Sequence, residues 1–102
     1  RTMQSYCTFS VGGSLSVNAH GITTDHCFAE SVVAFRVVTV DEAHNVAVQT
    51  CTPVDELFGL VLGGYGLFGI IVDVTLRVAD NAQLEMDAFM MEDPAEFERV
   101  YE

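Results

Sequence analysis

Two glycine-containing segments are the parts of this 102-residue chain that could hold a ligand. The first, residues 10–21, reads SVGGSLSVNAHG, with Gly12 and Gly13 placed just before a run of small residues, Ser14 to Ala19. Such a run can form one or two helical turns, whose free backbone N–H groups and dipole suit an anion such as a phosphate. Missing side chains at the two glycines would let a ligand contact the backbone, whereas a purely structural loop is the alternative.

The second segment, residues 64–69, reads GYGLFG and matches the dinucleotide-binding pattern G-x-G-x-x-G. In dinucleotide-binding folds the pattern follows a strand and opens a helix, so that the helix N-terminus faces the pyrophosphate. Here a predicted helix, 54–62, precedes the glycines and a predicted strand, 70–78, follows them. We therefore interpret the segment as a structural turn in which glycines permit positive φ or close backbone approach. Tyr65 and Phe68 are interpreted mainly as packing residues.

Cations are scarce, because the chain has four arginines, no lysine and a net charge of −11. Without lysine, neither a Walker-type phosphate lysine nor a Schiff base is available. The negative charge argues against nucleic acid and anionic membranes as main partners. No apolar run reaches the ~18 residues that a membrane span needs. We expect no nucleic-acid partner and no membrane partner.

The cysteines and histidines show no metal-site pattern. Cys7, Cys27 and Cys51 contain no C-x-x-C pair and are expected to be reduced, mostly buried thiols of a cytoplasmic protein. His26 lies between Asp25 and Cys27, but adjacent residues rarely face one ion, so no metal is expected. His44 is expected to lie in a solvated turn. Met86, Met90 and Met91 are expected to pack in the core.

Strands and short turns are predicted to position the glycine segments. Residues 32–40, VVAFRVVTV, are mostly apolar and β-branched, which predicts a strand buried on both faces. Residues 46–51 follow a polar five-residue turn, so 32–51 predicts an antiparallel hairpin. Residues 70–78 alternate, with Val72, Val74 and Leu76 among the even positions on the core face and Ile71 on the opposite face. A further strand is expected at 84–91.

Two helices are predicted from their start signals. Thr52 is the expected N-cap and Pro53 the first helical residue of an amphipathic helix over 54–62, which the glycines at 63 and 64 end. Asp93 and Pro94 signal a second helix near the end of the chain. Because no βαβ rhythm is present, we expect an α+β fold with a mainly antiparallel sheet and flanking helices.

The blocks SVGGSLSVNAHG, ESVVAFRVVTVD and CTPVDELFGLVLGGYGLFGIIVDVTLRV resemble a known family in order and spacing. They are similar to the second half of the FAD-binding domain of the vanillyl-alcohol-oxidase (PCMH-type) flavoproteins, which include cytokinin dehydrogenases and sugar-lactone oxidases. The resemblance covers about residues 6–78, and 79–102 form an acidic C-terminal extension. In that family FAD lies between two α+β subdomains, of which this chain resembles the second.

The first subdomain of that family carries a glycine-containing phosphate loop, often with a histidine that bonds the flavin covalently. Nothing here resembles that loop, nor the substrate-binding domain that normally lies downstream. The sequence does not begin with Met. We therefore expect residues 1–102 to be a single domain cut from a longer protein, with the first FAD subdomain and the substrate domain as its partners.

The resemblance implies six cofactor-binding residues: Ser10, Gly12, Gly13, Ser16, His20 and Ile71. Ser10 stands where the family has Thr or Ser, whose hydroxyl reaches the cofactor. Gly12 and Gly13 match the paired glycines at the phosphate and ribityl region. Ile71 matches a residue whose backbone meets the adenine side of FAD, and His20 stands where the family often has Ile or Gly.

The implied function is the FAD-binding part of an oxidoreductase that oxidises an alcohol, lactone or similar C–H donor by hydride transfer to flavin. The flavin performs the redox step, so no catalytic residue is required of this chain. The isolated chain is expected to bind FAD weakly or not at all. The alternative is a non-catalytic nucleotide-binding or interaction domain that kept the fold.

Overall fold

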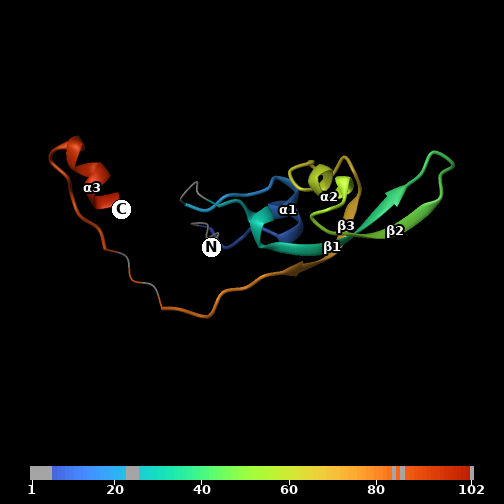
Figure 1. Ribbon diagram of the computed structural model, residues 1–102, viewed down its shortest axis with the longest axis horizontal. Helices are drawn as coiled ribbons and strands as arrows, with labels where there is room; N and C mark the ends of the chain where they lie inside the picture. Colours follow the sequence, from blue (N-terminus) through green and yellow to red (C-terminus); the bar gives the residue numbers. More distant parts are fainter. Residues whose placement is uncertain (1–5, 23–25, 84, 86, 102) are drawn as a thin grey trace.

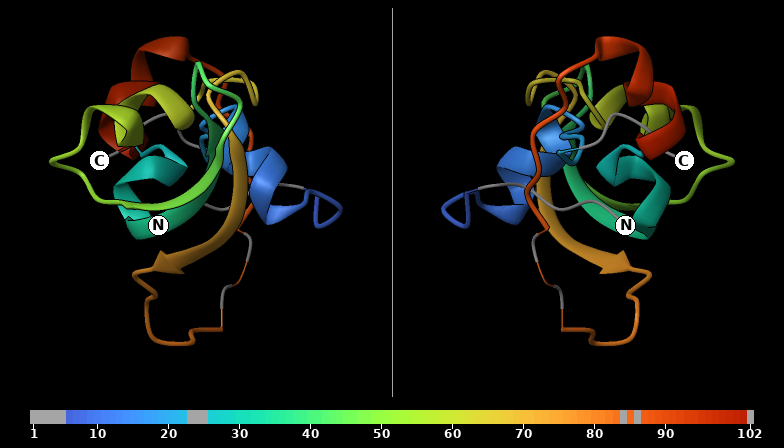
Figure 2. Two further views of the ribbon diagram at one scale, coloured as in Figure 1. Left: turned by 90° about the vertical axis from the view of Figure 1, so that its right-hand side faces the viewer. Right: turned by 90° about the vertical axis from the view of Figure 1, so that its left-hand side faces the viewer.

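A three-stranded antiparallel sheet is the centre of the molecule (Figure 1). The computed structural model describes residues 6–22, 26–83, 85 and 87–101. Strands β1 (Val32–Val40), β2 (Val46–Cys51) and β3 (Ile70–Leu76) lie in the order β2-β1-β3. The strands curve strongly when seen end on (Figure 2). Together with the helices this is an α+β arrangement with an antiparallel sheet, as predicted.

Short helices complete the described part of the chain. The α-helices are α1 (Val11–Ser16), α2 (Glu56–Val61) and α3 (Phe97–Tyr101), and the 3-10 turns are η1 (Phe28–Ser31) and η2 (Pro94–Glu96). The core takes residues from α1, α2, β1 and β2, namely Leu15, Val32, Phe35, Val37, Cys51, Phe58 and Val61. Within it the rings of Phe35 and Phe58 stack with centroids 5.1 Å apart, which fixes α2 on the sheet.

The predicted hairpin is confirmed with its bounds. Asp41 closes the turn, because its two carboxylate oxygens accept hydrogen bonds from the backbone N–H and the side-chain amide of Asn45 at 2.8 and 3.0 Å. His44, at φ 63°, is exposed in this turn, as expected. The prediction that β1 is buried on both faces is wrong, since Arg36 and Val33 are exposed.

A β-bulge explains why the predicted core face of β3 is right for Val74 and Leu76 but wrong for Val72 and Ile71. Arg36 pairs with Asp73 and Val37 pairs with Ile71, so Val72 is an extra residue on β3. A bulge of this kind shifts the alternation of side chains by one. As a result Val72 is 52% exposed, whereas Ile71 packs against the core together with Val74 and Leu76.

Helix α2 begins later than the sequence predicts. Its N-cap is Asp55 rather than Thr52, and Pro53 lies in the preceding turn. The Asp55 carboxylate accepts hydrogen bonds from both the backbone N–H and the hydroxyl of Thr52, at 2.7 and 2.8 Å. The expected cap is therefore reversed, because the threonine donates to the aspartate three residues later instead of accepting from the helix.

The C-terminal part extends away from the sheet. Figure 1 shows α3 and the β1–β2 hairpin at opposite ends of a molecule measuring 63 × 28 × 26 Å. Residues 85 and 87–91 form no strand, so the strand predicted over 84–91 is wrong there, while Leu84 and Met86 lie outside the described residues. The capping signal at Asp93 is confirmed, since its carboxylate accepts from the Ala95 N–H at 2.9 Å.

Two packing expectations also need correction. Met90 is 95% exposed and is not a core residue, whereas Met91 is half-buried. The three cysteines are free thiols, but only Cys51 is buried, with Cys27 half-buried and Cys7 exposed. Among the residues that the structure describes, no helix is long and apolar enough to cross a membrane.

Candidate functional site

A cavity of about 340 Å³ joins the two glycine segments. Four of the six predicted site residues line it: Gly12, Gly13, Ser16 and Ile71. The other lining residues come from α2, the loop before β3 and the start of β3, namely Val61, Gly66, Phe68, Gly69 and Ile70. Segments about fifty residues apart in sequence therefore share one concave surface.

Backbone hydrogen bonds hold α1 against the loop between α2 and β3. The carbonyl of Leu15 accepts from the N–H of Gly63 at 3.0 Å, and the carbonyl of Ser16 accepts from the N–H of Tyr65 at 2.9 Å. These bonds use carbonyls at the C-terminal end of α1, of which that of Leu15 also accepts from the N–H of Asn18 at 3.0 Å. Because Leu15 is also fully buried, the position of α1 beside the cavity is set by both packing and hydrogen bonding.

The start of α1 differs from the sequence prediction. The helix begins at Val11, so both glycines lie inside its first turn rather than before it. Ser10 is the N-cap, and its hydroxyl oxygen accepts from the Gly13 N–H at 3.1 Å. The N–H groups of Val11 and Gly12 have no acceptor within the helix, and Gly12 borders the cavity.

Ser10 and His20 do not line this cavity. The Ser10 hydroxyl caps α1, although the same hydroxyl keeps its proton available for donation to another acceptor. The His20 ring nitrogen Nδ1 lies 2.6 Å from the carbonyl oxygen of Gly21, and His20 forms an isolated β-bridge with Cys27. The structure thus brings four of the predicted residues together and leaves these two outside.

The loop between α2 and β3 has the backbone that its glycines predict. Gly63, Gly66 and Gly69 have φ values of 77°, 79° and 140°, and the order helix, turn, strand is confirmed. The same loop also lines the cavity through Gly66, Phe68 and Gly69, which the sequence reasoning missed when it assigned only a turn. Tyr65 is 74% exposed, so its interpretation as a packing residue is wrong.

The chemistry of the cavity is neutral. Its walls are glycine backbone, the Ser16 hydroxyl and apolar side chains, and no charged residue lines it in the described part of the chain. A Cβ built on Gly12 would meet nothing within 4 Å, so the space beside this residue is open. Such a surface suits a flat apolar ring, or a phosphate that backbone N–H groups bind.

A polar cluster lies on the sheet, outside the cavity. The Arg36 guanidinium Nε donates to the Asp73 carboxylate at 2.8 Å, and Thr50 and Thr75 border the same shallow hollow. The hydrogen bond from Arg36 lowers the pKa of Asp73, and Asp73 in turn raises the pKa of Arg36. Because each charge is satisfied by the other, the pair links β1 to β3.

The described histidines and cysteines form no metal centre. His26 Nδ1 lies 2.9 Å from Glu30 Oε2, within one short segment. Within residues 6–22, 26–83, 85 and 87–101, no three metal-ligating side chains of His, Cys, Asp or Glu cluster together.

Comparison with known proteins gives no match: no family model fits the chain, and neither curated proteins nor solved structures show significant similarity to it.

Proposed function

We propose that this chain is the FAD-binding part of a flavin-dependent oxidoreductase, as the second subdomain of a PCMH-type FAD-binding domain. The observation that carries the proposal is the cavity shared by the two glycine segments. Both segments belong to the sequence blocks that resemble that family, and their separation in sequence does not require them to lie side by side in the fold. In this proposal the protein is cytoplasmic and oxidises an alcohol, lactone or similar C–H donor.

The residues of the cavity fit a dinucleotide cofactor through its neutral contacts. Gly12 offers backbone without a side chain, and the open space beside it would admit a ligand. The Ser16 hydroxyl can donate or accept a hydrogen bond. Apolar walls at Phe68 and Ile71 suit a ring system at one end of FAD. When bound, FAD would supply the redox chemistry by accepting a hydride from the substrate.

In this proposal the chain supplies only part of the binding site, and the size of the cavity supports that view. Ligand pockets span about 300–1,000 Å³, so 340 Å³ is near the lower limit and suits one portion of a dinucleotide. The remaining contacts would come from a first subdomain on the other side of the cofactor. Each ~1.4 kcal/mol of missing contact weakens binding tenfold, so the chain alone should bind FAD weakly, with a dissociation constant of order 0.1–1 mM.

Two glycines provide a matched pair of variants that test the site. Gly12 in α1 and Gly59 in α2 are both helical, and a Cβ on either meets nothing within 4 Å. Only Gly12 lines the cavity. We expect Gly12→Val to lower FAD affinity about tenfold or more and Gly59→Val to leave it within about twofold. Equilibrium dialysis with detection of flavin absorbance measures both.

Stability measurements distinguish a loss of FAD binding from a loss of folding. Both substitutions are made at a helical glycine that has open space around it. The free energy of unfolding of both variants should therefore lie within about 1 kcal/mol of the wild-type value. Equal loss of FAD binding in the two variants would contradict the proposed site. FAD binding that Gly12→Val leaves unchanged would also contradict the proposed site and favour a non-catalytic domain.

A further inference from the structure

One aromatic side chain, that of Phe68, borders the cavity in the part of the chain that the structure describes. Phe68 is 41% exposed, so part of its ring is open to a ligand rather than buried in the core. The other side chains of the cavity wall are aliphatic, apart from the Ser16 hydroxyl. A flat aromatic ring in the ligand would therefore find one aromatic partner in this wall.

The Phe68 ring is held by its contact with Gly64. Cδ2 of the ring lies 2.8 Å from the position that a Cβ on Gly64 would take, so the ring packs directly against this glycine. Gly64 is itself bound to α2, because its N–H donates to the Val61 carbonyl at 3.1 Å. The turn is closed by a hydrogen bond from the Leu67 N–H to the Gly64 carbonyl at 3.0 Å. The ring is thus anchored against the end of α2.

Gly69 fixes the other end of this loop. A Cβ on Gly69 would lie 2.5 Å from the Val38 carbonyl oxygen and 2.6 Å from the Val37 side chain, so the backbone here contacts β1 directly. Phe68 therefore stands between two glycines in close contact with regular elements, α2 on one side and β1 on the other. A side chain that is fixed before the ligand arrives loses little conformational freedom on binding.

We propose that Phe68 is the residue on which a flat aromatic ring of the bound nucleotide stacks. The inference rests on the proposed function, because it assigns one contact to the ligand of the same cavity. Adenine and isoalloxazine, the two ring systems of FAD, share the chemistry that this contact requires, namely a flat aromatic face. A phenyl ring has no conventional hydrogen-bond donor or acceptor, so Phe68 selects for the shape of the ring rather than for its polar groups.

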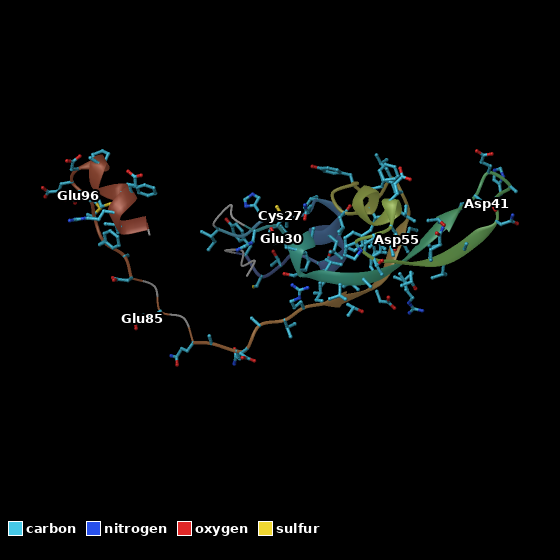
Figure 3. All side chains as sticks on the ribbon, in the orientation of Figure 1. Cys27, Glu30, Asp41, Asp55, Glu85 and Glu96 are labelled. Carbon is cyan, nitrogen blue, oxygen red and sulfur yellow. The ribbon has the colours of Figure 1, made fainter. Side chains whose placement is uncertain are left out.

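Two phenylalanine-to-leucine variants form a matched control. Phe68→Leu removes the ring from the cavity and keeps an apolar side chain, whereas Phe89→Leu makes the same change at a residue that is 58% exposed in the C-terminal extension. Figure 3 labels Glu85 and Glu96, which flank Phe89 in sequence, and both lie far from the sheet. In equilibrium dialysis we expect Phe68→Leu to weaken FAD binding about three- to tenfold and Phe89→Leu to leave it within about twofold.

ADP and FMN each carry one of the two ring systems and identify which of them stacks. At least one of these nucleotides should lose affinity in Phe68→Leu, by about the same factor as FAD. In ¹H spectra of the wild type, the ring protons of Phe68 should move upfield as that nucleotide is added, because a stacked aromatic ring shields them. Phe68→Tyr keeps the aromatic face and should bind FAD within about twofold of the wild type.

The ring-proton shift is measured on the wild type, so it remains a test even where Phe68→Leu disturbs the loop. Ring protons of Phe68 that stay in place when FAD, ADP and FMN are each added to millimolar concentration would overturn the inference. Equal affinities of Phe68→Leu and Phe89→Leu for all three ligands would overturn it as well. FAD binding that Gly12→Val weakens and Phe68→Leu leaves unchanged contradicts this inference alone, whereas binding that neither variant changes contradicts the proposed function too.

Discussion

Gly64 and Gly66 stand two residues apart in the loop before β3 but have opposite surroundings. A Cβ on Gly64 would lie 2.0 Å from the carbonyl oxygen of Leu60 and 2.8 Å from the Phe68 ring, so the backbone itself would have to move. A Cβ on Gly66 meets nothing within 4 Å, although its φ of 79° is strained for any side chain. The first position needs glycine for space and the second for conformation.

We therefore expect Gly64→Ala to lower the free energy of unfolding by about 3 kcal/mol or more, and Gly66→Ala by only about 1 kcal/mol. Urea unfolding followed by circular dichroism measures both. Equal losses would show that the close approach of Gly64 to α2 is not maintained in solution.

At this scale the residues of the candidate site were partly predictable. Because Gly12, Gly13 and Ser16 are near one another in sequence, their sharing of one surface was predictable. Ile71 joins them for a reason that sequence could not provide, because the bulge at Val72 turns its side chain toward the core instead of the opposite face. The contact between the His20 ring and the Gly21 carbonyl likewise depends on how the backbone folds there, and no sequence pattern predicts it.

Three aspartates each hold one junction between elements. Asp41 closes the β1–β2 turn, Asp55 connects β2 to α2, and Asp73 links β3 to β1. Hydrogen bonds from Asn45, Thr52 and Arg36 respectively lower the pKa of each carboxyl below its ordinary value of 3.8. The ionised form is therefore favoured in the folded state.

A pKa lowered by folding gives stability that is present above the unfolded value and is lost as the pH falls through the folded value. We expect Asp55→Asn to be less stable than the wild type at about pH 6. The difference should begin to shrink as the pH drops below about 4, where Asp55 of the unfolded chain becomes protonated, and should disappear once the pH is below the lowered pKa of the folded state.

Comparing variant with wild type at each pH removes most of the effect of the other acids, whose protonation relieves the repulsion of a chain with charge −11. Urea midpoints over this pH range provide the measurement. A difference that is constant with pH would show that the Asp55 carboxylate gives no ionisation-dependent stability.

Elements were predictable where one local signal dominated. The β-branched run and the polar turn gave β1 and β2 with their observed bounds. The start of α2 was misplaced because Thr-Pro is a common helix start, and only the structure shows Asp55 accepting from Thr52. The strand expected over 84–91 does not form in the described residues 85 and 87–91, because a strand needs a partner edge and these residues have none.

At the scale of the whole molecule, the cavity lies where α1, α2 and the start of β3 meet. The acidic extension adds a second region, since α3 lies far from the hairpin (Figure 1).

The most direct test of the FAD site is a map of where FAD touches the chain. In ¹H–¹⁵N correlation spectra of the labelled protein, titration with FAD to millimolar concentration should shift the amides of Gly12, Gly13, Ser16, Gly66 and Ile71 together. Amides of Val46 and Val48 should stay unchanged. Shifts confined to the cavity are the result predicted here. Shifts in only one of the two glycine segments, or shifts centred elsewhere, would contradict a cofactor site built from both.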